Sequence, residues 1–267
     1  MPSLPELEVD RLEFAGRLIG KQVTHIDALD YRDVRVDVHL LSQDIEGHPC
    51  TGVARYGKWF YLEFEAQPNQ LIFHLGLTGK LTLIALDGKL PRAASMTLDF
   101  DNNIRLVLGD ARHLGRVYWR PFQELKAEKM LGPDLLAVDE RYFMSVVPRK
   151  RRAVRDVIMD QKIIAGIGGK YADEALWRVK VHPNTKCDKI AETTMIELFE
   201  AAQDITKTAI ELGADVEKFP DSWLIPHRHT DRRCPRCGSE LTVRKLGGSE
   251  TYYCPVDQPA PMPFRSG

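Results

Sequence analysis

The hydrophobic pattern of this chain changes its period about halfway along, and this change limits the folds open to it. Between residues 22 and 120 the sequence consists of short alternating segments separated by turns, among them 35–40, 58–64 and 95–100. Alternation with a period of two is typical of half-buried strands in antiparallel sheets. From about residue 134 to 212 apolar residues recur at helical spacing, and the longest such segment is 193–212. The pattern predicts an α+β chain with separate β and helical parts.

The two ends of the chain and the junction complete this outline. Residues 5–20 are predicted to form a helix that ends at Gly20, and residues 121–133 are predicted to be a connector. The last forty or so residues are polar, rich in turns and contain cysteines. We therefore expect an N-terminal helix with an antiparallel β-sandwich in residues 1–122. A helical domain should follow in residues 123–226, and a C-terminal zinc-ribbon-like β-hairpin in residues 227–267.

Composition excludes several classes of protein. With 267 residues, 43% hydrophobic and 28% charged, the chain is expected to be folded and soluble. The absence of a long apolar run or an apolar signal segment predicts a cytoplasmic protein without a membrane partner. The net charge of −1 argues against indiscriminate polyanion binding. The basic residues are nevertheless clustered, which suits either a groove that follows phosphates or two solvated surface runs: Arg149, Lys150, Arg151, Arg152 and Arg155, and Arg228, Arg232, Arg233 and Arg236.

The cysteines have the spacing of a metal site rather than of a disulfide framework. Cys234 and Cys237 form a Cys-x-x-Cys pair, and after a spacer Cys254 is followed by Asp257, where a fourth thiolate would stand in a zinc ribbon. Three thiolates and one carboxylate predict a structural Zn²⁺ site at Cys234, Cys237, Cys254 and Asp257. The alternative is a ribbon-like hairpin that has lost its metal.

The chain begins with Met1-Pro2-Ser3-Leu4-Pro5-Glu6. Removal of the initiator Met leaves Pro2 with a secondary amine, and α-amino groups have pKa values near 8. Such an amine is partly neutral at cellular pH, so it can attack a sugar aldehyde and form an iminium. The alternative is an ordinary chain start whose acidic residues cap a first helix.

Three further segments contain groups suited to nucleic acid. Gly166-Ile167-Gly168-Gly169-Lys170 precedes a predicted helix, where backbone N–H groups can hold a phosphate, although a tight helix–helix turn explains it equally well. Residues 55–58 put Lys58 at the start of a strand. Residues 110–116 put basic groups around Leu114, and apolar wedges beside Arg are what proteins insert into a duplex. Leu114 fits an ordinary core position equally well.

In order and spacing, these segments resemble the formamidopyrimidine-DNA glycosylase/endonuclease VIII family along the whole chain. The opening is similar to that family's Pro-Glu-Leu-Pro-Glu start, and residues 74–79 are similar to its His-Leu-Gly-Met-Ser-Gly turn. Residues 110–115 resemble its Asp-Pro-Arg-Arg-Phe-Gly loop, and residues 160–183 resemble its helix–two-turns–helix core. The terminal cysteines resemble its zinc finger.

The resemblance implies a monomeric base-excision-repair enzyme that holds damaged or abasic double-stranded DNA between two domains. Such an enzyme is a DNA glycosylase and abasic-site lyase, with β- and δ-elimination through an N-terminal proline iminium. Pro2 is then the nucleophile, Glu6 a second carboxylate near the amine, and Lys58 and His74 the groups that hold flanking phosphates. The residues implied to fill the gap left by a flipped base are Leu77, Arg112 and Leu114, and the remaining implied DNA-contact positions are Gly169, Lys170 and Ser249.

The sequence departs from the family at functional positions. Ser3 stands where the family has the Glu that assists sugar-ring opening, and serine is a far weaker acid at neutral pH. Gly169 replaces an Asn, Ser249 replaces an Arg that grips the lesion phosphate, and Asp257 replaces a thiolate. The segment 213–227 is also short compared with the loop that caps the lesion in that family. These departures call recognition of 8-oxoguanine into question. They also predict that lyase activity is retained better than base excision.

Two other functions remain open at this point. A catalytically reduced protein of the same fold would bind damaged DNA without cleaving it, and the losses at Ser3, Gly169 and Ser249 favour it. A zinc-ribbon RNA-binding protein would explain only the C-terminal segment and would leave the N-terminal matches unexplained.

Overall fold

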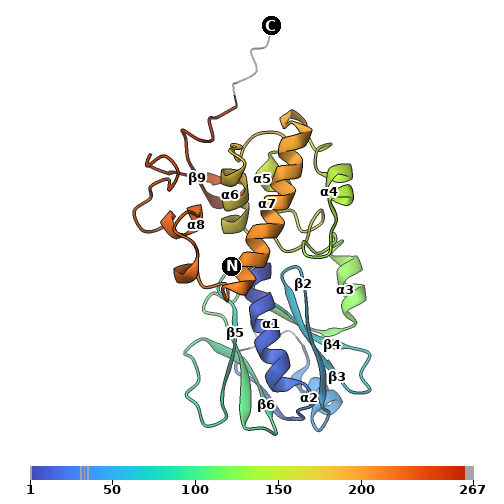
Figure 1. Ribbon diagram of the computed structural model, residues 1–267. Coiled ribbons are helices and arrows are strands. Elements are labelled where there is room, and N and C mark those ends of the chain that lie inside the picture. The colour runs from blue at the N-terminus through green and yellow to red at the C-terminus, as the bar shows by residue number, and fades with distance from the viewer. Residues whose placement is uncertain (1, 31, 33, 35, 262–267) are drawn as a thin grey trace. The chain divides into compact units, whose positions relative to one another are not determined.

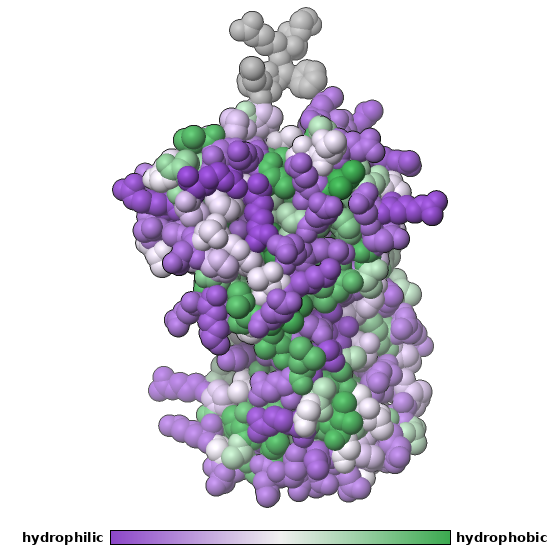
Figure 2. All heavy atoms as spheres, viewed as in Figure 1, coloured by the Kyte–Doolittle hydropathy of each residue, from purple (hydrophilic) through white to green (hydrophobic). Residues whose placement is uncertain are grey.

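The chain divides into two compact units, residues 1–130 and 131–267 (Figure 1). The structure, a computed structural model, describes residues 2–30, 32, 34 and 36–261. The predicted C-terminal hairpin belongs to the second of these units. Among the helices of the described residues, none combines the length and the hydropathy that a membrane span requires. Hydrophilic residues predominate on the face drawn in Figure 2.

The first unit is a β-sandwich with a leading helix, which confirms the predicted fold class. In its described residues one antiparallel sheet has the strand order β1-β6-β7-β5 and the other the order β2-β3-β4-β8. The strands are β1 (Val23–Ala28), β2 (Cys50–Tyr56), β3 (Trp59–Phe64), β4 (Gln70–His74), β5 (Lys80–Ala85), β6 (Ala94–Phe100), β7 (Ile104–Gly109) and β8 (Arg116–Arg120). The helices are α1 (Leu4–Leu18), α2 (Val38–Ile45) and α3 (Phe122–Glu128).

Helix α1 closes the hydrophobic core of the sandwich. Its buried residues recur on one face, because Leu7, Phe14 and Leu18 are spaced by whole turns. The Phe14 ring meets the Phe60 ring of β3 edge-on, with centroids 5.6 Å apart. The same core receives side chains from both sheets, among them Leu62, Phe73, Leu98, Phe100 and Leu106.

Two local predictions in this unit are wrong. The alternation at 35–40 predicted a strand, but residues Val38–Ile45 form α2, and residue 35 lies outside the described residues. The Asp37 side chain caps this helix by accepting the N–H groups of His39 at 3.0 Å and Leu40 at 3.2 Å. An N-cap acid and a buried pair four residues apart outweigh a short alternation. The predicted connector 121–133 contains α3, whose Phe122 and Leu125 are buried.

The second unit contains the predicted helices and the hairpin. Its helices are α4 (Glu140–Val146), α5 (Val154–Ile158), α6 (Gly169–Arg178), α7 (Glu192–Glu211) and α8 (Leu224–His227), with short 3-10 turns η1 (Cys187–Lys189) and η2 (Val216–Lys218). The hairpin strands are β9 (Thr242–Leu246) and β10 (Ser249–Tyr253), which pair antiparallel. Helix α6 is the centre of the unit, because it packs against α5, α7, α8 and β10.

Candidate functional site

The start of the chain is held by the first turn of α1. Ser3 is the N-cap residue and is 2% exposed. Its backbone N–H donates to Glu6 Oε2 at 2.8 Å, which places the Glu6 carboxylate close to Pro2. Pro2 is half-buried in front of this cap. A carboxylate beside an amine can take and return the protons that a nucleophilic amine releases.

Lys58 lies in the two-residue turn between β2 and β3, where Tyr56 pairs with Trp59. Its side chain is 6% exposed, and burial lowers its pKa to about 8, although the charge of Glu6 opposes this shift. Within the described residues, the Lys58 ammonium has no hydrogen-bond or ion-pair partner. A buried cation with no anion in direct contact is unfavourable, so this position is suited to an anionic ligand.

His74 ends β4 in the same sheet, close enough to Lys58 to feel its positive charge. Its ring packs against the Trp59 ring, with centroids 4.6 Å apart. Burial lowers the pKa of His74, and the positive charges of Lys58, Arg116 and Lys129 lower it further. Because the neighbouring positive charges disfavour protonation of His74, a bound phosphate would offset their repulsion and favour the charged form of each of these side chains.

Two loops of the first unit are joined by the buried carboxylate of Asp110. One Asp110 oxygen accepts the Thr78 hydroxyl at 2.5 Å, and the other accepts the N–H groups of Leu114 at 2.7 Å and Gly115 at 2.6 Å. Gly76 lies so near the second loop that an added Cβ would come within 2.6 Å of the Leu114 carbonyl. Gly76 also has a φ of +57°, so its conformation and its surroundings both require glycine.

These joined loops present apolar side chains to solvent. Leu77 is 47% exposed and Leu114 is 40% exposed, while Arg112 beside Leu114 is also exposed. Loops that are rigid at the backbone and apolar at the tip are suited to entering a gap in a stacked duplex. The alternative core position for Leu114 is therefore wrong.

The glycine-rich turn of the second unit begins α6. Gln161 holds this turn, because its side chain accepts the Gly166 N–H at 2.8 Å and donates to the Met159 carbonyl at 2.7 Å. Gly168 is the N-cap residue of α6, and as a glycine it has no side chain with which to cap the helix. The Lys170 ammonium lies 4.9 Å from the centre of the Tyr171 ring. An N-terminus of this kind attracts anions.

Ser249 begins β10 and contacts a residue that the sequence placed in a surface cluster. Its Oγ accepts a hydrogen bond from Arg155 Nη1 at 2.9 Å. Arg155 is 1% exposed, and Arg228 of the second basic cluster is 8% exposed. Two of the clustered arginines are therefore interior residues. Their helical and loop positions alone could not reveal this, because burial here depends on the hairpin that folds over them.

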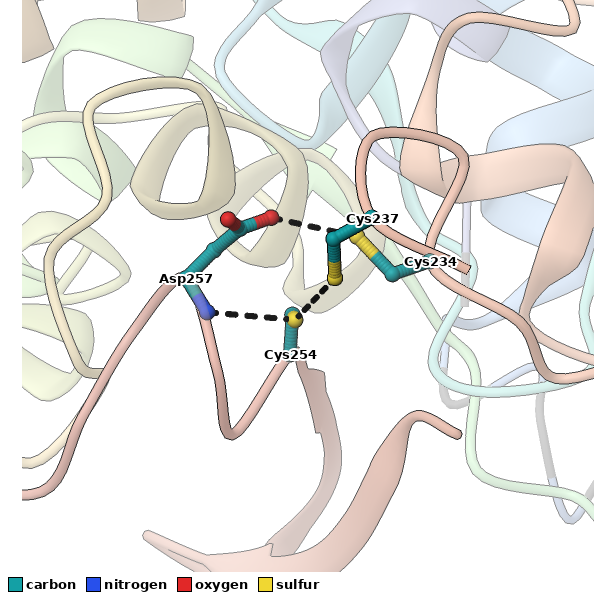
Figure 3. A group of neighbouring side chains, drawn as sticks. All are labelled: Cys234, Cys237, Cys254 and Asp257. Carbon is teal, nitrogen blue, oxygen red and sulfur yellow. Dashed lines mark hydrogen bonds between the residues drawn. The ribbon is translucent and has the colours of Figure 1, made fainter. Parts of the chain in front are cut away.

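The predicted metal ligands form one cluster, drawn in Figure 3. The ligand atoms of Cys234, Cys237, Cys254 and Asp257 all lie within 4.8 Å of one another. Bonds of about 2.3 Å from zinc to sulfur put tetrahedral ligands roughly 3.8 Å apart, and the sulfurs of Cys237 and Cys254 are 3.5 Å apart. The donor set and its spacing fit a tetrahedral metal ion.

Neighbouring groups orient these ligands. The Trp177 indole of α6 donates to Cys234 Sγ at 3.3 Å, and the Asp257 backbone N–H donates to Cys254 Sγ at 3.3 Å. Arg236 Nη1 lies 3.5 Å from Asp257 Oδ2 and stacks over the Trp177 ring. Such surrounding contacts fix the geometry of metal ligands, and here they attach the cluster to α6.

Comparison with known proteins agrees with this description. Residues 1–117 match the sequence model of the formamidopyrimidine-DNA glycosylase N-terminal domain, and residues 131–221 match that of the formamidopyrimidine-DNA glycosylase H2TH domain. Formamidopyrimidine-DNA glycosylase of Lactococcus lactis subsp. cremoris is 29% identical over 276 residues, covering 97% of this chain and 99% of the relative. The enzyme of that name from Rhodococcus jostii is 28% identical over 287 residues, covering 98% and 97%.

Solved structures give the same result. The complex of Lactococcus lactis Fpg with abasic-site DNA has a TM-score of 0.86 at 28% identity, covering 97% of this chain and 100% of that one. The complex of this enzyme with DNA containing FAPY-dG has a TM-score of 0.85 at 26% identity, covering 96% and 100%. The fold and the site therefore define a DNA-repair class with an N-terminal sandwich, a helical unit and a cysteine-bearing hairpin. The chain belongs to the formamidopyrimidine-DNA glycosylase/endonuclease VIII family, which confirms the predicted membership.

Proposed function

We propose that this chain is a base-excision-repair DNA glycosylase with abasic-site lyase activity, and that Pro2 is its nucleophile. The observation that carries the proposal is the arrangement at the chain start, in a member of this family. Half-buried Pro2 precedes a cap whose Glu6 carboxylate accepts the next backbone N–H at 2.8 Å. The buried Lys58 ammonium lies in the field of the same carboxylate. This is the set of groups that iminium chemistry at a sugar requires.

The reaction is easiest to follow on an abasic site. The neutral Pro2 nitrogen attacks the open-chain aldehyde at C1′, and loss of water from the carbinolamine leaves an iminium. Removal of a C2′ proton then expels the 3′ phosphate, and a second elimination expels the 5′ phosphate. Hydrolysis returns free Pro2. Glu6 is the proposed carrier of protons to and from this nitrogen, because it is the carboxylate held beside it.

The remaining predicted residues have binding roles in this proposal. Lys58 and His74 hold phosphates that flank the lesion, and Leu77, Arg112 and Leu114 enter the gap left by the flipped base. The second and third proposed domains, residues 123–226 and 227–267, also contact DNA. The second does so through Gly169 and Lys170, and the third through Ser249. Cys234, Cys237, Cys254 and Asp257 would hold a structural Zn²⁺, which would fix the hairpin β9–β10. We expect a monomer bound to damaged or abasic double-stranded DNA.

Ser3 makes base excision the weaker of the two activities. Its side chain is 2% exposed and caps α1, and a hydroxyl is a poor proton donor at neutral pH. An abasic site already presents an aldehyde in equilibrium with its closed form, so the lyase steps need no help with base departure. The same observation favours the second candidate function, a binder of damaged DNA that does not cleave it.

Borohydride trapping tests the proposal. Wild-type protein and Ser3→Glu are incubated with abasic-site and 8-oxoguanine duplexes, and peptide mapping locates any reduced adduct. We expect an adduct at Pro2 with abasic DNA for both proteins. With 8-oxoguanine DNA, Ser3→Glu should exceed wild type by roughly 100-fold, the usual size of acid–base assistance.

The other outcomes separate the alternatives. If mass spectrometry confirms N-terminal Pro2 and the protein binds abasic duplex but forms no adduct, the chain is a binder and the enzymatic proposal is wrong. If the protein prefers RNA to duplex DNA, both DNA functions are wrong.

A further inference from the structure

The loop that carries Leu114 has a left-handed residue at its centre. Residues 110–115, called the wedge loop below, turn around the Asp110 carboxylate, which accepts the N–H groups of Arg112 at 3.2 Å and Leu114 at 2.7 Å. Between these two residues His113 has a φ of +54°. The left-handed turn at His113 lets both neighbours donate to one carboxylate while their side chains stay exposed.

The backbone at this position does not require an imidazole ring. Glycine adopts a positive φ most readily, and asparagine is among the other residues that do so singly. The His113 side chain is nevertheless only 25% exposed, although the residues on either side of it are exposed. A half-buried ring on a left-handed backbone at the tip of a functional loop indicates that the side chain itself has a role.

The His113 ring lies beside Asp30, a residue that follows β1. His113 Nδ1 is 3.8 Å from Asp30 Oδ2, a distance at which a protonated ring and a carboxylate attract each other. Arg32 Nε donates to Asp30 Oδ1 at 3.0 Å, and the hydrogen bonds from Arg32 hold the pKa of Asp30 well below its usual range. The Asp30 carboxylate therefore stays ionised and attracts the ring.

Asp30 is itself fixed to the sheet. Its backbone N–H donates to the carbonyl of Ser95 in β6 at 3.1 Å. Ser95 is 0% exposed, and its hydroxyl donates to the Leu108 carbonyl of β7 at 3.2 Å. At the start of the wedge loop, the Asp110 N–H donates to the Ala93 carbonyl at 2.9 Å. The ring therefore connects the tip of the loop to backbone that the sheet holds in place.

A pocket of about 320 Å³ borders the wedge loop. Its lining includes Ala111 and His113 of the loop and Asp30, Arg32 and Arg92 of the neighbouring segments. The loop thus faces open space here instead of packed side chains, and segments with few packed contacts open most easily. The attraction between the ring and Asp30 acts where packing does not hold the loop.

We infer that His113 is a positioning residue: its ring, held by Asp30, fixes the tip of the wedge loop so that Arg112 and Leu114 point outward before DNA is bound. The inference rests on the proposed function, because it assumes that these side chains enter the gap left by a flipped base. Neither His113 nor Asp30 needs to touch DNA in this role. Together they reduce the entropy that the loop loses when Leu114 enters the gap.

Binding to abasic and intact duplexes tests this role. His113→Asn and His113→Gly keep a residue that accepts the left-handed backbone but remove the ring, and Asp30→Asn removes the charge that attracts it. Each variant should bind abasic duplex roughly 3- to 10-fold more weakly, which corresponds to the ordering of a mobile side chain. Affinity for intact duplex should be unchanged, because that duplex offers no gap. Thermal melts confirm that each variant is folded.

Double variants show whether these residues act through one another. The losses of His113→Asn and Asp30→Asn should not add, and His113→Asn should cost little once Leu114→Ala is present, since an absent leucine needs no positioning. The salt dependence of the affinity of His113→Asn should equal that of wild type, because no phosphate contact is removed.

His25 provides the matched control. It belongs to β1 in the same unit, and its Nδ1 lies 3.7 Å from Glu46 Oε1, so it forms a similar pair with a carboxylate outside the wedge loop. His25→Asn should bind both duplexes as wild type does.

Three results would overturn the inference. Wild-type affinity for abasic duplex in folded His113→Asn and His113→Gly would show that the ring positions nothing. An equal loss on intact duplex, with the slope of log affinity against log salt concentration reduced by about one, would show that His113 contacts a phosphate directly. If wild type itself does not prefer abasic to intact duplex, the proposed function fails and this inference falls with it, a failure already visible without any variant.

Discussion

Lys58 shows how a single residue can be unfavourable for stability and useful for binding. Its pKa falls from 10.5 to about 8 because burial removes water from the ammonium. Below pH 8 the side chain is charged in both the folded and the unfolded protein, so the folded state bears the full cost. Above pH 10.5 it is neutral in both states and the cost vanishes. The cost is about 3.5 kcal/mol at most, because the fall from 10.5 to about 8 spans about 2.5 pKa units and each corresponds to about 1.4 kcal/mol.

Replacement of Lys58 by Met should therefore stabilise the protein and weaken DNA binding. We expect the free energy of unfolding to rise by about 1–3 kcal/mol at pH 7, with the difference from wild type shrinking between pH 8 and pH 10.5. Affinity for abasic duplex should fall roughly tenfold or more with the loss of a charge-assisted contact. Denaturant unfolding across this pH range and a binding titration measure the two effects.

Lys89 provides the matched control, because it is an exposed lysine of the same unit. Lys89→Met should change neither the stability nor its pH dependence by more than about 0.5 kcal/mol. A Lys58→Met protein that is less stable than wild type at pH 7 would show that the Lys58 ammonium is compensated in the free protein.

At the scale of elements, the two loops around Asp110 act as one rigid support. The Asp110 carboxylate joins Thr78 of one loop to Leu114 and Gly115 of the other. Strands β4 and β8, which lead into and out of these loops, pair directly from His74–Arg116 to Gln70–Arg120. The exposed leucines thus project from backbone that the sheet holds in place, so little ordering entropy is lost when they enter DNA.

Leu114→Ala should weaken binding to abasic DNA without destabilising the fold. Burial of a leucine side chain contributes about 1.5–3 kcal/mol, which corresponds to a loss of roughly 10- to 100-fold in affinity. The loss should be absent with intact duplex, which offers no gap. Equilibrium binding to both duplexes and a thermal melt measure this.

Leu12 on α1 is the control for this variant, because it is 53% exposed and outside the loops. Leu12→Ala should leave both affinities unchanged. Equal losses on abasic and intact duplex for Leu114→Ala would mean that the side chain does not enter the lesion.

At the scale of the whole molecule, the metal ligands connect distant parts of the second unit. Cys254 donates its backbone N–H to the Gln258 side chain, which in turn donates to the Val181 carbonyl beyond α6. Together with the Trp177 contact to Cys234, this attaches the metal cluster to the helices. All four ligands of the cluster belong to the second unit.

Metal removal should therefore loosen one unit only. We expect purified protein to contain zinc, and a chelator to lower the melting temperature of the second unit while the first is unaffected. Asp257→Cys should retain zinc against roughly tenfold or more chelator, because thiolates suit zinc better than a carboxylate. Elemental analysis and calorimetry provide the measurements. Well under one zinc per chain would show that Asp257 does not complete a site.

Much of this organisation was predictable from the residues themselves. The change of period predicted the order of sandwich and helices, and the cysteine spacing predicted the ligands that lie within 4.8 Å of one another. Local patterns succeeded where one element's own residues determine its structure, as in α1 with its cap. They failed at α2, where six alternating residues imitated a strand but an N-cap and a buried helical face prevailed.

The sequence could not predict which charged side chains are buried. Arg149 to Arg155 form one run, yet Arg155 is interior because β10 folds over α5. Similarly, nothing local distinguishes Lys58 from an exposed turn lysine until the sheet and α1 enclose it. The family, most of the elements and the identity of the chemical groups could be predicted from the residues alone, since these depend on residue type and spacing. Which charges lost their water followed from the fold, because desolvation depends on neighbours far away in the chain.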